Sequence, residues 1–294
     1  MEIERITVHQ YDIPLYEPFV TALKPIPELE RVLVEVETSG GITGLGEGAP
    51  AYEVTAAVID DVLAPLVIGE NPLDIERLRG RMWDLVDGSP AAHAAVEIAL
   101  QDVRGKAAEM PLYRLLGGHA EVPVIDAPKV LSIKAPEEMA EDAITAVDAG
   151  YEQIKIKVGG DPATDVERVQ AIDDAVPDDV SLKADANQGW SDAKTALAAL
   201  SEIGTTIDVI EQPVDVNNVA DLRELRRRVD IPVMADESVE SPEDALDLVE
   251  RKAADMYNIK LMKAGGISEA IRLDSVAAAD GRPTQLGSMV EGGV

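Results

Sequence analysis

The stretch QIKIKVG, residues 153–159, has the composition of a β-strand that carries two lysines on one face. Three aliphatic residues alternate with Lys155 and Lys157, and successive side chains of a strand point to opposite faces. On an edge strand with one wet face, both lysines would be solvated. On a central strand, two ammonium groups would point into the protein, at a cost in free energy that implies a function.

The chain around this stretch alternates strand-like and helical segments from about residue 121. The strand-like segments lie at 122–130, 153–159, 180–186, 206–213, 231–238, 255–262 and 282–288. The helical segments between them lie at 137–150, 161–176, 191–204, 218–229, 241–253 and 267–280. Repeated strand–helix units predict a parallel sheet, and seven in series favour a (β/α) barrel over an open sheet.

The first 120 residues have a different pattern. Strand-like segments come first, and segments with helical periodicity follow at 54–69, 72–88 and 90–110. The strand-like segments lie at 6–15, 31–40 and 42–50, and the SGG turn between the last two fits a hairpin. We therefore expect an α+β domain over residues 1–120 and a barrel domain over residues 121–294, with the chemistry in the barrel.

Composition excludes several classes of protein. The formal net charge of −30, from 56 acidic and 26 basic residues, would repel nucleic acid. The absence of cysteine excludes disulfides, zinc sites with thiolate ligands and cysteine nucleophiles. No apolar run reaches the length of a membrane span and the N-terminus has no signal-peptide pattern, so we expect a cytoplasmic protein. The acidic surface and only 11 lysines suggest the hypothesis of adaptation to high salt.

Charged residues recur where five successive predicted strands end. They are Lys157, Asp185, Glu211, Asp236 and Lys260, spaced by 24 to 28 residues, which is about one strand–helix unit. The five side chains should therefore lie at one height around the carboxyl ends of the strands, where barrels carry their chemistry. Three carboxylates flanked by lysines predict a site for a hard dication such as Mg²⁺. A ring of structural salt bridges is the alternative.

The chain resembles the enolase superfamily in its muconate lactonizing enzyme subgroup. The barrel half carries the resemblance in KIKVG (155–159), DAN (185–187), EQP (211–213), DES (236–238) and NIKLMKAGG (258–266). The first half carries it in LVEVETSGGITGLGEGAP (33–50) and AVEIALQDVRGKAAEMPLYRLLGG (95–118). The resemblance implies an α+β capping domain over a modified barrel that binds one Mg²⁺. It also implies abstraction of the proton α to a substrate carboxylate, with an enolate intermediate.

The resemblance also implies roles for the charged residues. Asp185, Glu211 and Asp236 would hold the metal. Lys157 would be the general acid/base, and Lys155 would favour its neutral form through like-charge repulsion. Lys260, on the opposite side of the barrel from Lys157, would approach the other face of the α-carbon.

Two opposed bases suit a racemase or epimerase, whereas a cycloisomerase or a dehydratase needs only one acting lysine. Asn187 could steady a metal ligand, contact the base or pack in the core. We expect Lys183 to be structural, Glu237 to face away from the metal as a supporting or interface residue, and Lys263 to lie on the surface or in a loop. The histidines all fall in the first 120 residues, which disfavours the mandelate racemase branch with its barrel histidine; they are His9, His93 and His119.

The segment PFVTALK (18–24) resembles the opening of the dipeptide epimerases, in which a basic residue reaches the side-chain carboxylate of the substrate. Lys24 stands at that position, and Phe19 could form a lid over the site. We therefore expect an epimerase of Ala-Glu-like dipeptides. The alternatives are a muconate or chloromuconate cycloisomerase and an o-succinylbenzoate synthase-type reaction.

The pattern stops at the seventh barrel strand, so an eighth strand is expected to be missing from this chain. That leaves a catalytically impaired member of the family as a further alternative. We expect a homo-oligomer that acts on a small carboxylate substrate.

Overall fold

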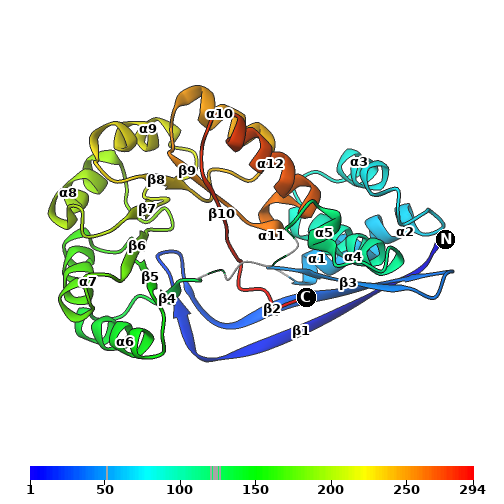
Figure 1. Ribbon diagram of the computed structural model, residues 1–294, viewed down its shortest axis with the longest axis horizontal. Coiled ribbons are helices and arrows are strands. Elements are labelled where there is room, and N and C mark those ends of the chain that lie inside the picture. Colours follow the sequence, from blue (N-terminus) through cyan, green and yellow to red (C-terminus); the bar gives the residue numbers. More distant parts are fainter. Residues whose placement is uncertain (51, 120, 122–124, 126) are drawn as a thin grey trace.

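The computed structural model describes residues 1–50, 52–119, 121, 125 and 127–294. Figure 1 shows an antiparallel sheet with its helices beside a curled parallel sheet with helices around its outside. The described residues thus form an N-terminal α+β part and a (β/α) barrel of seven strands that is open on one side, as predicted. Among the described residues, no helix is both long and apolar enough to cross a membrane.

The N-terminal sheet has three antiparallel strands in the order β1-β2-β3. They are β1 (Ile3–Val20), β2 (Pro25–Thr38) and β3 (Thr43–Gly48). The first two extend beyond the predicted segments, because they pair with each other from Ile3 to Val20. Around this sheet lie α1 (Tyr52–Val58), a π-helical turn (Ile59–Leu63), α2 (Ala64–Val67), α3 (Ile75–Leu85), α4 (Pro90–Ala107) and α5 (Leu112–Leu115).

Glycines let α4 lie directly on β3. A Cβ atom at Gly44 would be 2.1 Å from the carbonyl oxygen of Ala99, and one at Gly46 would be 2.0 Å from that of Ala95. Both distances are far inside van der Waals contact, so the helix can approach only where the strand lacks side chains. The GLGEG run therefore determines how closely the sheet and the helix pack.

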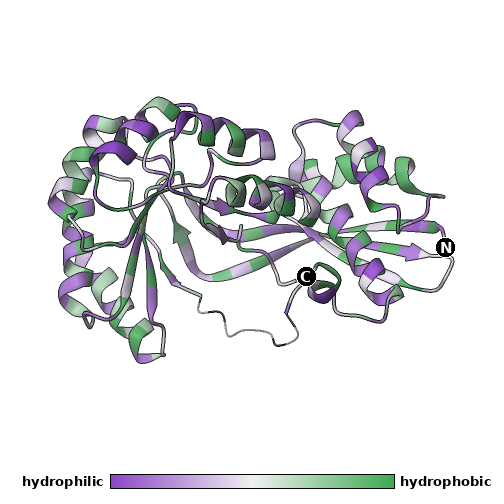
Figure 2. Ribbon diagram, turned by 45° about the horizontal axis from the view of Figure 1, so that its top comes forward, coloured by the Kyte–Doolittle hydropathy of each residue, from purple (hydrophilic) through white to green (hydrophobic). Residues whose placement is uncertain are grey.

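The parallel sheet has seven strands in the order β10-β9-β8-β7-β6-β5-β4. They are β4 (Lys129–Leu131), β5 (Gln153–Lys157), β6 (Ser181–Asp185), β7 (Val209–Glu211), β8 (Val233–Ala235), β9 (Met256–Ile259) and β10 (Thr284–Leu286). The helices are α6 (Pro136–Asp148), α7 (Pro162–Ala175), α8 (Ala193–Ile203), α9 (Val219–Arg228), α10 (Pro242–Arg251), α11 (Leu261–Ala264) and α12 (Ile267–Ala279). Figure 2 shows hydrophobic and hydrophilic residues interspersed along these helices, as expected for elements with one buried face.

The position of β5 answers the question that QIKIKVG raises. The strand is internal, because it pairs with β4 on one side and with β6 on the other. Ile154, Ile156 and Val158 are fully buried in the core between sheet and helices. Lys155 and Lys157 face the opposite way and are also buried, at 8% and 7% exposure. The lysines therefore point into the barrel.

Two details of the barrel differ from the predicted elements, and the number of strands agrees with them. The first barrel strand covers only Lys129–Leu131 of the described residues, and positions 122–124 and 126 of the predicted strand lie outside them. The strand β9 ends at Ile259, so Lys260 precedes the short helix α11 instead of lying on a strand. Within the described ranges, β4 and β10 are the two edges of a seven-stranded sheet, and no eighth strand joins them.

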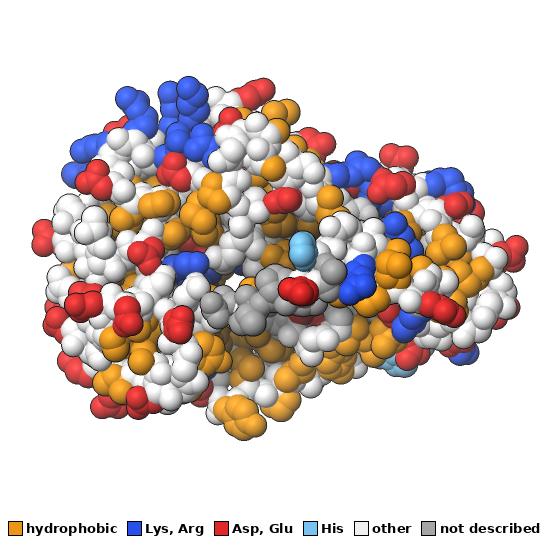
Figure 3. All heavy atoms as spheres, in the orientation of Figure 1, with side chains coloured by type: hydrophobic (Ala, Val, Ile, Leu, Met, Phe, Trp, Pro, Cys, Tyr) orange, Lys and Arg blue, Asp and Glu red, His pale blue; other side chains and the backbone are white. Residues whose placement is uncertain are grey.

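After β10, residues 287–294 return to the N-terminal sheet. Arg31 of β2 donates from Nη2 to the carbonyl oxygen of Met289 at 3.0 Å, and from Nε to that of Val290 at 3.2 Å. Figure 3 shows acidic side chains spread over the visible face, with a group of basic side chains over α9. The last described segment of the chain is therefore held against the N-terminal part by a buried arginine.

Candidate active site

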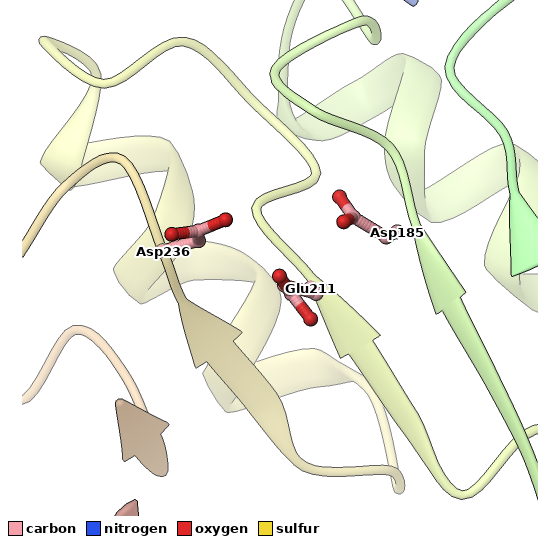
Figure 4. Close-up of side chains that lie close together, drawn as sticks. All are labelled: Asp185, Glu211 and Asp236. Atoms are coloured by element: carbon pink, nitrogen blue, oxygen red, sulfur yellow. The ribbon is translucent and has the colours of Figure 1, made fainter. Parts of the chain in front are cut away.

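Three carboxylates converge at the carboxyl ends of neighbouring strands (Figure 4). Asp185 is the last residue of β6, Glu211 is the last residue of β7, and Asp236 directly follows β8. The sheet register places Lys157 opposite Asp185 and Asp185 opposite Glu211. One oxygen of each carboxylate lies within 4.8 Å of the others, and all three side chains are buried. Buried oxygens at this spacing form a donor set that suits a hard dication.

Lys155 lies between two of the carboxylates. Its Nζ is 2.7 Å from Oδ2 of Asp185 and 2.7 Å from Oε1 of Glu211. Burial alone would lower the pKa of Lys155, but the two carboxylates outweigh it, so the pKa lies above its ordinary value. Lys155 is therefore a fixed cation at the centre of the site.

Lys157 lies two residues after Lys155 on β5, on the same face of the strand, and donates hydrogen bonds to two side chains. Its Nζ donates to Oδ2 of Asp185 at 2.7 Å and to Oδ1 of Asn187 at 2.7 Å. Both lysines thus approach the same oxygen of Asp185. Of the alternatives for Asn187, the structure shows contact with the amine of Lys157 and also a backbone bond to Asp185.

The opposite flank of the triad carries two further lysines. Lys260 Nζ lies 2.5 Å from Oδ2 of Asp236, and Lys263 Nζ lies 2.6 Å from Oδ1 of the same carboxylate. The prediction that Lys263 is a surface or loop residue is wrong, because its side chain is buried beside the triad. The reason is α11: residues three apart on a helical turn share a face, so Lys263 follows Lys260 inward.

The three carboxyl groups differ in their electrostatics. Burial, together with Asp185, raises the pKa of Glu211 to about 7 against the opposing effect of Lys155. For Asp185, burial is outweighed by Lys155 and Lys157, and the pKa lies well below its ordinary value. For Asp236, burial is outweighed by Lys263 and Lys260, which lower the pKa to about 2. Negative charge around Glu211 is therefore only partly compensated by the protein, and a bound dication would neutralise it.

Two residues near the triad are placed as supporting groups. Lys183 is half-buried on β6 and donates to Oε1 of Gln285 at 3.3 Å. Glu237 accepts a hydrogen bond on Oε1 from Nδ2 of Asn187 at 3.1 Å. Glu237 therefore supports a residue that itself contacts Lys157.

The β1–β2 loop lies against the mouth of the barrel. The Val20 N–H donates to Oγ of Ser132 at 2.6 Å, and a Cβ atom at Gly159 would lie 2.9 Å from Cβ of Ala22. Phe19 is half-buried next to this loop, and Lys24 is exposed on it. Neither side chain takes part in the hydrogen-bonded network around the triad described above.

The histidines lie away from the triad. His93 is buried in α4, stacks on Trp83 with ring centroids 4.2 Å apart, and shares a hydrogen bond of 2.9 Å with the Val86 carbonyl oxygen. His9 lies on β1 and His119 is exposed after α5. The basic side chains described in contact with the triad are lysines.

Comparison with known proteins agrees with this arrangement. Residues 3–117 match the family described as mandelate racemase / muconate lactonizing enzyme, N-terminal domain. Residues 138–294 match the family described as enolase C-terminal domain-like.

Individual relatives are similar over the whole chain. An N-succinyl-L-Arg/Lys racemase of Bacillus cereus is 38% identical over 100% of this chain and 82% of the relative. An L-Ala-D/L-Glu epimerase of Bacillus subtilis is 38% identical over 99% of this chain and 82% of the relative. A crystal structure of a dipeptide epimerase of Enterococcus faecalis, complexed with Mg and the dipeptide L-Leu-L-Tyr, superposes with a TM-score of 0.94 at 36% identity, over 98% of this chain and 83% of that one. The chain therefore belongs to the mandelate racemase/muconate lactonizing enzyme family of the enolase superfamily.

Proposed function

We propose that the chain is a magnesium-dependent isomerase that racemises or epimerises the α-carbon of a dipeptide or an N-acylated amino acid. The observation that carries the proposal is the position of two buried lysines on opposite flanks of one carboxylate triad. Lys157 contacts Asp185 at one end of the triad, and Lys260 contacts Asp236 at the other. A substrate bound between them would present one face of its α-carbon to each amine.

The main barrier in this reaction is the negative charge that develops when the weakly acidic α-proton is removed. Mg²⁺ held by Asp185, Glu211 and Asp236 would neutralise the charge of the substrate carboxylate. Lys155, a fixed cation between Asp185 and Glu211, adds positive charge that needs no reorganisation. Lys157 and Lys260 would take the proton from one face and deliver a proton to the other.

Specificity would come from the β1–β2 loop. Its base is attached to the barrel through the hydrogen bond between Val20 and Ser132, so the loop lies beside the carboxyl ends of the first barrel strands. Lys24 would attract an acidic group at the far end of the substrate, as in Ala-Glu-like dipeptides, and Phe19 would pack on its apolar part. The similar proteins named for dipeptides and for N-succinylated amino acids define the substrate classes to test.

The test is α-proton exchange in D₂O with Mg²⁺, followed by NMR and mass spectrometry on a dipeptide library and on N-succinyl amino acids. Lys157→Ala should abolish exchange for one epimer and Lys260→Ala for the other, because each removes one base. Lys194→Ala, at an exposed lysine of α8, is the matched control and should exchange both. Full exchange of both epimers by either active-site variant would contradict the proposal.

One other reaction is favoured by a specific observation. A chloromuconate cycloisomerase of Cupriavidus necator is 31% identical over 99% of this chain and 81% of the relative. Lactone formation from muconate, with no exchange of any dipeptide, would support that reaction instead. Metal binding without turnover of either substrate class would support an impaired family member.

Three broader expectations also become proposals here. Adaptation to high salt predicts that the melting temperature rises between low and molar NaCl, because salt screens the repulsion within a chain of net charge −30. Homo-oligomerisation is tested by light scattering on the purified protein. Cytoplasmic localisation is tested by fractionation of the source cells.

A further inference from the structure

Asn187 lies between the amine of Lys157 and the carboxylate of Glu237. Its Oδ1 accepts from Lys157 Nζ at 2.7 Å, and its Nδ2 donates to Glu237 Oε1 at 3.1 Å. Asn187 is only 7% exposed. The second oxygen of Glu237 is buried and has no hydrogen-bond partner among the described residues. The bond from Asn187 to the first oxygen is therefore the hydrogen bond that holds this carboxyl group in place.

The backbone of Asn187 is held in place from several sides. Asn187 and Gln188 both have left-handed conformations, with φ of 40° and 68°. The Asn187 N–H donates to Oδ1 of Asp185 at 2.9 Å, and the Gln188 N–H donates to the Gln212 carbonyl oxygen at 2.8 Å. These hydrogen bonds hold both residues in their left-handed conformations. The main freedom left to the side chain is which end of its amide faces Lys157.

Glu237 decides that orientation. Its Oε1 accepts from the NH₂ end of the amide, which leaves the amide oxygen facing Lys157. A neutral lysine amine has two N–H bonds and one lone pair. With Asp185 and Asn187 accepting both N–H bonds, the lone pair remains available to take a proton from carbon. The reversed amide would donate to that lone pair and block the base.

We propose that Glu237 is a positioning residue that orients the Asn187 amide and thereby keeps the lone pair of Lys157 free. The inference rests on the proposed function, in which Lys157 is one of two bases. It predicts an effect on one face of the substrate, because Lys260 donates to Asp236 at the opposite end of the triad. A general weakening of the barrel would affect both faces.

The test compares Glu237→Gln with wild type. Glutamine has nearly the same shape but also carries an NH₂ group, so it permits the reversed amide. The matched control is Glu243→Gln, at an exposed glutamate of α10. We expect kcat for α-proton exchange to fall about tenfold or more for the epimer that Lys157→Ala cannot exchange, with KM unchanged and the other epimer within about twofold. An equal fall for both epimers, or no fall, would overturn the inference.

A second measurement needs no turnover and separates this inference from the proposed function. In metal-free, ¹⁵N-labelled protein, the Asn187 side-chain NH₂ is assigned by its absence in Asn187→Ala. Its hydrogen exchange with solvent should accelerate about fivefold or more in Glu237→Gln and stay unchanged in Glu243→Gln, because the charged acceptor is lost. Unchanged exchange in Glu237→Gln would refute the orienting role. Wild-type protein that exchanges no substrate would refute only the proposed function.

Discussion

Replacing Lys263 by methionine should destabilise the metal-free protein strongly, although the side chains have similar length. The amine of Lys263 is buried and lies 2.6 Å from Oδ1 of Asp236. It also donates to the backbone carbonyl oxygens of Asp236, Val239 and Asn258. Methionine fills the space but provides no donor.

The expected magnitude follows from these contacts. Removing one partner of a buried ion pair typically costs about 3–5 kcal/mol, because the remaining charge stays buried without compensation. Here Asp236 keeps Lys260 as a second cation at 2.5 Å, which reduces the cost. The three carbonyl oxygens that lose their donor add to it. We therefore expect the free energy of unfolding to fall by about 3 kcal/mol.

The assay is urea denaturation at pH 7.5 with EDTA present, followed by circular dichroism and by tryptophan fluorescence. EDTA keeps any bound dication from compensating for the lost ammonium group. Lys194→Met is the matched control at an exposed position, and it should change the free energy of unfolding by less than about 0.5 kcal/mol. A loss below about 1 kcal/mol in Lys263→Met would refute the reasoning, because it would show that this amine does not compensate the buried Asp236.

Three further predictions concern other parts of the molecule. Because the pKa of Glu211 is raised to about 7, a metal ion that binds at lower pH must displace a proton from this carboxyl group. The Mg²⁺ affinity measured by calorimetry should therefore rise up to about pH 7 and then level off. A constant affinity from pH 5.5 to 8 would contradict this. Glu97 caps α12 through the Ile267 N–H at 2.8 Å and is fully buried, so Glu97→Ala should cost about 2–4 kcal/mol of unfolding free energy in urea titrations, whereas Glu167→Ala at an exposed site should be neutral. Burial lowers the pKa of His93, so the unfolded chain binds the proton more tightly and stability should fall as pH drops below about 6.5. In thermal melts, His93→Phe should reduce this loss of stability at low pH. An unchanged loss in the variant would exclude His93 as its source.

The carboxylate triad could be predicted from sequence because of a simple regularity. Parallel strands of a (β/α) barrel end at the same rim, and each strand–helix unit has a similar length. Asp185, Glu211 and Asp236 recur at that spacing, and the structure brings one oxygen of each within 4.8 Å of the others. Strand periodicity likewise placed Lys155 and Lys157 on one face.

Residues outside the strands were harder to predict. The orientation of Lys263 depends on α11, a helical turn of four residues that the strand-like pattern of 255–262 did not indicate. The contact between Glu237 and Asn187 joins the loop after β8 to the loop after β6. Nothing in the local sequence of either loop indicates this contact. The capping of α12 by Glu97 joins residues 170 positions apart.

The sequence by itself therefore determined the alternation of strands and helices, the common face of Lys155 and Lys157 on β5, and the level in the barrel at which the charged residues recur. These features follow from periodicities of two and of one strand–helix unit, which each segment carries locally. Only the tertiary structure decided that QIKIKVG is an internal strand and which oxygen each lysine contacts. Those choices depend on hydrogen bonds of fixed direction between segments far apart in the chain, and such bonds form only when the whole barrel is assembled.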